Sequence, residues 1–151
     1  MGCGPISKLR AAALDGLLEI VGVDPLNDLY DAVIARHGYD GLPRIRPDTR
    51  INGFAEEIDF GGRTFDFVFS LNALDHTQDL LLSLVSMIDV LSERGLGYAQ
   101  VYINEGEKQN YSGLHKYTLW PEGNDVFFST KDTAPASLTQ AIPRLEIDQV
   151  W

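Results

Sequence analysis

Hydrophobic and polar positions follow two different periods along the first third of the chain. Residues 6–15 carry apolar side chains at helical spacing, and residues 17–23 form an almost continuous apolar run that ends before Asp24. Residues 26–37 return to helical spacing. A continuous apolar run is typical of a strand that is buried on both faces of a parallel sheet. This part of the chain therefore predicts helix, strand and helix in that order.

The middle of the chain repeats this alternation. Residues 65–71 predict a strand, residues 78–94 an amphipathic helix that Thr77 caps, and residues 97–103 a further strand. Strands that alternate with helices are typical of an α/β fold with a doubly wound, mostly parallel sheet and helices on both faces. Without an internal repeat or a linker, we expect one domain over residues 1–151. Shorter strands are expected near residues 44–46, 126–128 and 145–150.

Composition and charge narrow the function classes. The 151 residues are 44% hydrophobic, and 12 basic against 22 acidic residues give a net charge of −10. An acidic chain is poorly suited to phosphate backbones or anionic membranes, so we expect neither nucleic acid nor membrane as a partner. No apolar run approaches the ~20 residues that span a bilayer. With no signal-peptide pattern and a single cysteine, Cys3, we expect a cytoplasmic location.

A glycine-rich start and a later acid form a candidate nucleotide site. Gly2 and Gly4 precede the first predicted helix, and Asp24 ends the following strand. Glycines let a backbone approach a ligand closely, a helix N-terminus offers free N–H groups, and an acid at this position can accept both ribose hydroxyls. The alternative is a glycine-rich turn in which Asp24 only caps the next helix. A nicotinamide cofactor would also suit this pattern.

Three stretches of the chain form an ordered set of motifs: Gly-Cys-Gly-Pro at residues 2–5, Gly-Val-Asp-Pro at residues 22–25 and Phe-Asp-Phe-Val-Phe-Ser-Leu-Asn-Ala-Leu-Asp-His at residues 65–76. Together they resemble the class I S-adenosylmethionine-dependent methyltransferases, and residues 95–97, 105–107 and 111–115 look like the bacterial small-molecule branch of that family. The resemblance implies a Rossmann-like sheet with S-adenosylmethionine across the carboxyl ends of its strands. It also implies methyl transfer to a small-molecule substrate.

The resemblance also assigns roles to residues. The backbone of residues 2–4 would contact the amino-acid part of the cofactor, Asp24 would hold the ribose hydroxyls, and Asn72 would border the methionine end. Pro25 and Leu26 would lie beside the adenine, with residues 55 and 56 near its edge. The implied cofactor-binding residues are Gly2, Cys3, Gly4, Asp24, Pro25, Leu26, Ala55, Glu56 and Asn72.

His76 and His115 are the candidate catalytic residues, because an imidazole can accept a proton from an acceptor group near neutral pH. His76 precedes Asp79 by three residues, so the two could instead satisfy backbone groups at a helix entry. His115 could equally pack among Tyr117 and Trp120. No metal site is expected, since further ligands are not obvious nearby in the sequence.

The chain departs from the family pattern at three points. Ile6 stands where a further glycine is usual, Phe54 stands where an acid is usual, and the strand that precedes the glycine motif is missing. We expect either a true start upstream of Met1 or a remnant that pairs its open sheet edges elsewhere, for example in a dimer. The alternative functions are therefore a catalytically inactive, methyltransferase-like binding module and, as a further rival, an NAD-dependent oxidoreductase.

Overall fold

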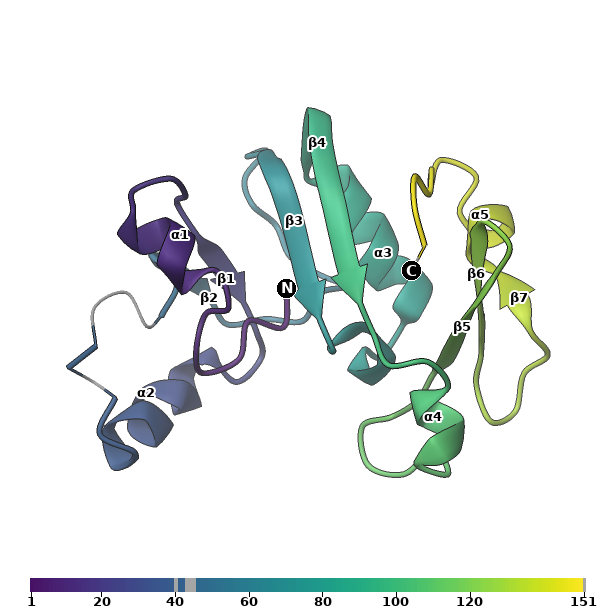
Figure 1. The fold of residues 1–151 in the computed structure, drawn as a ribbon, viewed down its shortest axis with the longest axis horizontal. Coiled ribbons are helices and arrows are strands. Elements are labelled where there is room, and N and C mark those ends of the chain that lie inside the picture. Colours follow the sequence, from purple (N-terminus) through teal and green to yellow (C-terminus); the bar gives the residue numbers. More distant parts are fainter. Residues whose placement is uncertain (40, 43–45, 151) are drawn as a thin grey trace.

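The computed structural model describes residues 1–39, 41–42 and 46–150, which form three groups of elements (Figure 1). In the N-terminal group, two helices accompany a pair of parallel strands. Val21 pairs with Thr49 and Val23 with Ile51. The elements of this group are α1 (Arg10–Leu14), β1 (Val21–Val23), α2 (Asn27–Arg36) and β2 (Thr49–Ile51).

The central group contains the second parallel pair and the most apolar helix. Phe65 pairs with Leu91, but Phe67 pairs with Leu96, so the register shifts between these two positions. The side chain of Asp79 accepts a hydrogen bond from the Leu82 N–H at 2.9 Å and caps the helix. The elements are β3 (Phe65–Leu71), the 3₁₀ turn η1 (Leu74–His76), α3 (Leu80–Asp89) and β4 (Leu91–Gln100).

The C-terminal group is an antiparallel sheet with one short helix on each side of it in the sequence. Its strands lie in the order β5, β6, β7. Trp120 pairs with Phe127, and Phe128 pairs with Ala136. The elements are α4 (Glu105–Lys108), β5 (Thr118–Glu122), β6 (Asp125–Ser129), β7 (Ala136–Ser137) and α5 (Leu138–Ala141).

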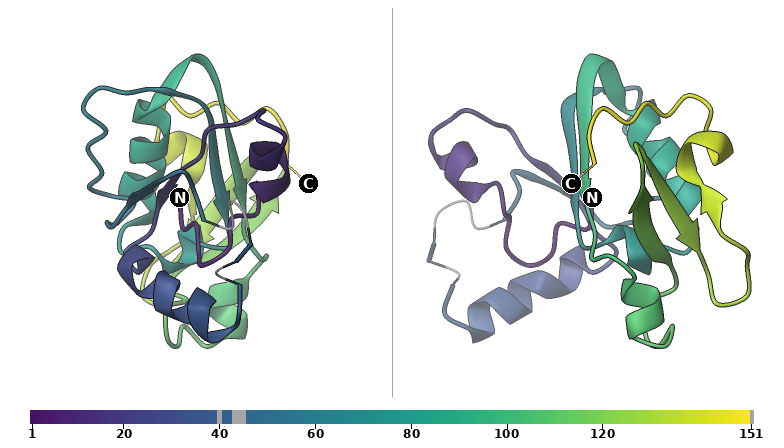
Figure 2. Two further views of the ribbon diagram at one scale, coloured as in Figure 1. Left: turned by 90° about the vertical axis from the view of Figure 1, so that its left-hand side faces the viewer. Right: turned by 45° about the vertical axis from the view of Figure 1, so that its right-hand side comes forward.

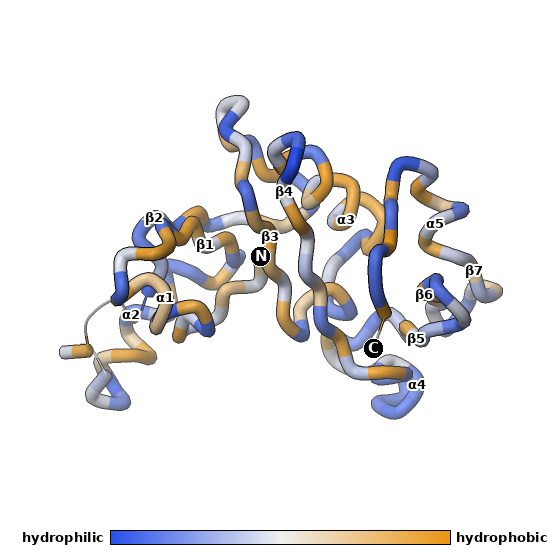
Figure 3. Tube along the Cα trace, turned by 45° about the horizontal axis from the view of Figure 1, so that its top comes forward, coloured by the Kyte–Doolittle hydropathy of each residue, from blue (hydrophilic) through white to orange (hydrophobic). Residues whose placement is uncertain are grey.

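The hydrophobic core lies between the central and C-terminal groups. Helix α3 stands between the β3–β4 pair and the antiparallel sheet, and it is strongly hydrophobic along its length (Figure 1 and Figure 3). Its fully buried Leu80 belongs to one hydrophobic cluster with side chains from β3, β5 and α5. The buried members of this core are Val68, Leu74, Leu80, Leu84, Met87, Leu119, Leu138 and Ile142.

The two parallel pairs do not join into one sheet. Among the described strands, β1 pairs only with β2 and β3 only with β4. The N-terminus lies between the two pairs, which stand apart in the right-hand view of Figure 2. The Met1 amine donates a hydrogen bond to the Phe69 carbonyl at 2.5 Å, and the Cys3 N–H donates to the Val23 carbonyl at 3.3 Å. Residues 1–3 therefore connect the carboxyl ends of β1 and β3.

The expected α/β alternation is present, but several boundaries differ. The helix expected over residues 78–94 ends at Asp89, because Leu91 pairs with Phe65 and the following residues form a strand beside β3. Gly95 lies in that strand, where a Cβ would stand 2.8 Å from the Phe65 carbonyl. The Thr77 hydroxyl bonds to the Leu74 carbonyl, so Asp79 is the cap in its place.

Two further expectations concern short strands. Residues 145–150 contain no regular secondary structure, although a strand was expected there. The strand expected at residues 44–46 falls mostly outside the described residues, and β2 forms further along the chain. Among the described residues, no helix has both the length and the apolar character needed to cross a membrane.

Candidate functional site

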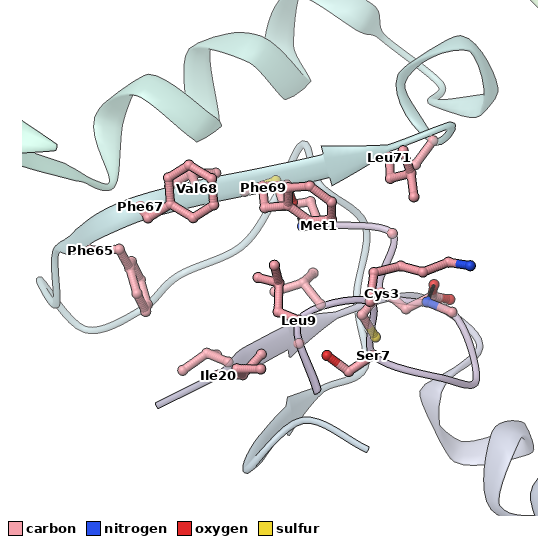
Figure 4. A pocket seen from close by; sticks show the side chains of 18 of the residues that line it. Met1, Cys3, Ser7, Leu9, Ile20, Phe65, Phe67, Val68, Phe69 and Leu71 are labelled. Carbon is pink, nitrogen blue, oxygen red and sulfur yellow. Dashed lines mark hydrogen bonds between the residues drawn. The ribbon is translucent and has the colours of Figure 1, made fainter. Parts of the chain in front are cut away.

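A cavity of about 750 Å³ opens between β1 and β3 and runs along both strands (Figure 4). One end lies at the carboxyl ends of the strands and is lined by polar groups and glycine backbone. The other end is lined by apolar side chains, where Leu9 and Ile20 stand opposite the aromatic residues of β3. The polar end is the candidate site, because it gathers the glycine motif and the acid that the sequence singled out.

The glycine loop at residues 2–4 has positive φ angles at both glycines, and residues with a Cβ adopt such angles only with strain. Gly2 has φ +61°, and a Cβ there would stand 2.3 Å from the Ala73 Cβ. Gly4 has φ +62° but nothing within 4 Å of its Cβ position. Gly2 therefore allows close packing against the segment after β3, whereas Gly4 leaves space on its open side.

Asp24 follows β1 directly and is buried, with 7% of its surface exposed. Its carboxylate accepts hydrogen bonds from the Gly4 N–H at 3.1 Å, the Leu26 N–H at 2.9 Å and the Tyr30 hydroxyl at 2.9 Å. Since a carboxylate has about four acceptor positions, these bonds leave little free capacity. Asp24 thus both joins the glycine loop to α2 and presents an anionic group at the polar end.

Arg46 and Asn27 also hold the glycine loop, although neither carries a local sequence signal for this role. The Arg46 guanidinium donates to the Gly4 carbonyl at 2.8 Å and to the Asn27 side-chain oxygen at 2.8 Å, and it lies over the Tyr30 ring. Asn27 is buried and donates to the Ile51 carbonyl at 2.6 Å. Together they fix the glycine loop to both strands of the N-terminal pair.

Burial alters the acidity of the groups around this loop. It raises the pKa of the Cys3 thiol, with the nearby Asp24 charge acting in the same direction. It also raises the pKa of Tyr30, whose hydroxyl donates to Asp24. Burial lowers the pKa of the Met1 amine. The raised pKa of Cys3 disfavours the thiolate, which is the form in which a cysteine acts as a nucleophile.

Asn72 brings an unsatisfied acceptor to the same end of the cavity. Its backbone has φ +48°, and its N–H donates to the Gln100 carbonyl at 2.7 Å. Its side-chain oxygen is buried and has no hydrogen-bond partner among the residues that the structure describes. Buried acceptors are nearly always paired in proteins, so this oxygen is suited to a donor from a ligand.

Both candidate histidines lie beside Asp75, just past Asn72. The Nε2 atom of His76 is 3.1 Å from Nδ1 of His115, and their rings meet edge to face. The Asp75 carboxylate is 2.9 Å from the same His115 atom and 3.3 Å from His76 Nε2. The alternative role of Asp79 at a helix entry is confirmed, because its side chain accepts from the Leu82 N–H and caps α3. Asp75 is the partner that the sequence analysis missed.

The cavity collects some of the predicted residues and leaves others outside. Glu56 accepts hydrogen bonds from the Gln78 and Asp79 N–H groups, at 2.6 and 3.1 Å, so its carboxylate is engaged at the start of α3. Leu26 is half exposed. The predicted residues that line the cavity are Gly2, Cys3, Gly4, Asp24, Asn72 and His76. Those that lie outside its lining are Pro25, Leu26, Ala55, Glu56 and His115.

Comparisons with known proteins identify the family of the chain. A family model described as a methyltransferase domain matches residues 1–99, which is more than half of the chain. The chain therefore belongs to the methyltransferase domain family. Among curated relatives, Bacillus subtilis (strain 168) YrhH, a methyltransferase by name, is 38% identical over 58 residues, which are 38% of this chain and 32% of that protein.

Solved structures share the fold. The PH0226 protein from Pyrococcus horikoshii OT3 superposes with a TM-score of 0.52 at 18% identity, over 90% of this chain and 63% of that one. An S-adenosylmethionine-dependent methyltransferase from Clostridium acetobutylicum ATCC 824 gives 0.51 at 12% identity, over 90% of this chain and 61% of that one. The chain thus spans less than two thirds of these structures and about a third of YrhH.

Proposed function

We propose that this protein transfers a methyl group from S-adenosylmethionine to a small-molecule acceptor. The observation that carries the proposal is the meeting of three features at the carboxyl ends of β1 and β3. They are the glycine loop at residues 2–4, the buried carboxylate of Asp24 and the unpartnered side-chain oxygen of Asn72. Membership of the methyltransferase domain family supports the same function.

The residues present fit this cofactor. Asp24 would accept the ribose hydroxyls once the Tyr30 hydroxyl gives up its position on the carboxylate. The open side of Gly4 leaves room for the amino-acid part, and the Asn72 oxygen would accept from its ammonium group. When bound, the cofactor supplies an electrophilic methyl group on a sulfonium. The main contribution of the chain would be to align the acceptor with that group and to exclude water.

His76 and His115 are the proposed proton acceptors. The two imidazoles lie 3.1 Å apart, and His76 lines the cavity. Either ring could take the proton of an acceptor hydroxyl or amine as the methyl group arrives. A net charge of −10 makes a nucleic-acid acceptor unfavourable, which supports a small molecule instead.

The two parallel pairs are proposed to be parts of one doubly wound sheet that lacks the strand between β1 and β3. The apolar end of the cavity runs between the two open edges, and residues 1–3 already bond to the carbonyls of Val23 and Phe69. These edges are suited to pairing between two copies of the chain. A catalytically inactive binding module is the second candidate, because the Asp24 carboxylate already accepts hydrogen bonds from three groups of the chain itself.

Calorimetric titration with S-adenosylhomocysteine tests the proposal. We expect stoichiometric, micromolar binding that Asp24→Ala abolishes. Asp15→Ala removes an exposed acid outside the cavity, carries the same change of charge and should bind as the parent chain does. Circular dichroism must first show that both variants are folded. A folded parent chain that does not bind would exclude the methyltransferase function for this chain and favour the binding module.

A further inference from the structure

We propose that Asp75, His76 and His115 form a binding site for a divalent transition-metal ion. The three candidate ligand atoms are Oδ2 of Asp75, Nε2 of His76 and Nδ1 of His115. The Asp75 oxygen lies 2.9 Å from the His115 nitrogen and 3.3 Å from the His76 nitrogen, and the two nitrogens are 3.1 Å apart. Metal–ligand bonds of about 2.0–2.2 Å at tetrahedral or right angles place neighbouring ligand atoms about 2.8–3.5 Å apart. The triangle therefore has the dimensions of one face of a metal coordination shell.

Hydrogen bonding alone satisfies this triangle poorly. A nitrogen of a neutral imidazole is either a donor or an acceptor, and a carboxylate only accepts. A proton on His115 Nδ1 would be shared between Asp75 and His76, and a proton on His76 Nε2 would be shared between Asp75 and His115. A metal ion would accept one lone pair from each of the three atoms at once. It therefore explains why all three atoms point to the same place.

The ligand set indicates the class of metal. Two imidazoles and one carboxylate suit zinc, iron, manganese, cobalt or nickel, whereas magnesium and calcium prefer oxygen ligands. Three protein ligands leave coordination positions open, as in catalytic and not in closed structural sites. Within the described part of the chain, this is the one cluster of histidine, cysteine or acidic side chains with such spacing.

The scaffold holds the ligands in place without a metal. Asp75 lies in η1 with its side chain 5% exposed, and its backbone carbonyl accepts from the Lys116 N–H at 3.0 Å. This bond fixes the segment that carries His115 against η1. The Tyr117 hydroxyl adds a second connection, because it donates to the Gln78 carbonyl at 3.0 Å. The two histidine side chains remain 34% and 27% exposed, so an ion can reach them.

The position of the triangle suggests what its open positions hold. His76 lines the same cavity as Gly2 and Asn72, so a metal here would stand beside the proposed cofactor end. With an ion bound, the ligating nitrogens of His76 and His115 would hold it and would not accept a proton. On the proposed function, the exchangeable positions would then bind an acceptor oxygen that has lost its proton to solvent. This narrows the acceptor class to molecules that carry a carboxylate, a phenol or a similar metal-binding oxygen.

Metal binding is tested on the full chain without a polyhistidine tag, after chelator treatment and dialysis into thiol-free buffer. Titration with Co²⁺, followed by visible absorption, should give one site with bands typical of nitrogen and oxygen ligands. Zn²⁺ should displace Co²⁺ from it, and Mg²⁺ should not. His76→Gln and His115→Gln should each weaken Co²⁺ binding by about 100-fold. Loss of a residue that only hydrogen-bonds to a metal ligand already costs up to about 100-fold in affinity.

The third histidine of the chain provides the matched control. His37→Gln, at the end of α2, should leave Co²⁺ binding unchanged. Because Asp75 is buried, the exposed His76 gives the variant that is safest for folding, and circular dichroism verifies each protein. Absence of binding, or binding that survives both site variants, would overturn the metal site. Binding of S-adenosylhomocysteine is measured separately on the metal-free protein. The metal site and the cofactor site can therefore fail independently of each other.

Discussion

The hydroxyl of Tyr30 occupies the position on Asp24 that a ribose would need. It donates to the carboxylate at 2.9 Å, beside the bonds from the Gly4 and Leu26 N–H groups. The polar end of the cavity therefore carries an internal competitor for its own proposed ligand. The competitor is a single hydroxyl group, and a substitution by phenylalanine removes it while keeping the aromatic ring beneath Arg46.

Tyr30→Phe is expected to tighten S-adenosylhomocysteine binding severalfold, because it frees one acceptor position on Asp24. The same change should lower the free energy of unfolding by about 1 kcal/mol, the usual net contribution of a hydrogen bond. Calorimetry and urea unfolding measure the two effects. Tyr39→Phe, outside the cavity, is the control. Weaker binding by a folded Tyr30→Phe protein would show that the hydroxyl assists the ligand and does not compete with it.

At the scale of elements, α3 depends on a residue from another group. Glu56 follows β2, yet its carboxylate accepts from the Gln78 and Asp79 N–H groups, and its backbone carbonyl accepts from the Ser86 hydroxyl. The start of a helix carries unpaired N–H groups and a positive dipole end, so an acid there is stabilising. Glu56 thus joins the N-terminal group to the core helix.

Glu56→Ala is expected to lower the free energy of unfolding by about 1 kcal/mol, as for the loss of a helix cap. Glu56→Gln keeps an acceptor oxygen and should lose less. Glu57→Ala removes the neighbouring, exposed acid with the same change of charge and should have little effect. Urea unfolding of the three variants measures the difference. Equal losses for Glu56→Ala and Glu57→Ala would contradict the capping role.

The elements that were predicted correctly are those with a local signal. The strand at residues 65–71 has the predicted bounds, because apolar and aromatic side chains fill five of its seven positions and mark it within the local sequence. The predicted end of α3 was wrong because Leu91 pairs with Phe65, which is distant in the sequence, and the residues after the helix therefore form β4. The same reason explains the site. Residues 2–4 and Asp24 follow a spaced motif, whereas Asp75 and His115 meet across 40 residues.

At the scale of the whole molecule, the N-terminal group is joined to the rest mainly at its edges. The buried members of the hydrophobic core all lie between Val68 and Ile142. The contacts of the N-terminal group described above run through Met1, Gly2 and Glu56. Between the groups lies the apolar end of the cavity, where Phe67 is 43% exposed. An exposed apolar strand edge of this kind favours association with another chain.

We expect the chain to associate through these edges, with an apparent mass that rises with concentration in size-exclusion chromatography with light scattering. Phe67→Lys places a charge at the open edge and should shift the protein toward the monomer. Leu29→Lys, at an exposed position on α2 outside the cavity, should not. A parent chain that stays monomeric across the concentration range would refute pairing through these edges.

The location of the core also sets an order of events during synthesis. A ribosome adds about 5–20 residues per second, so roughly 2–7 s separate the synthesis of Glu56 from that of Asp89 at the end of α3. During that interval, the glycine loop, β1 and α2 have been made, but β3 and the helix that Glu56 caps are only then appearing. The part proposed to hold the cofactor is thus translated before the helix that anchors it, and it stays unanchored in the nascent chain until that helix has formed.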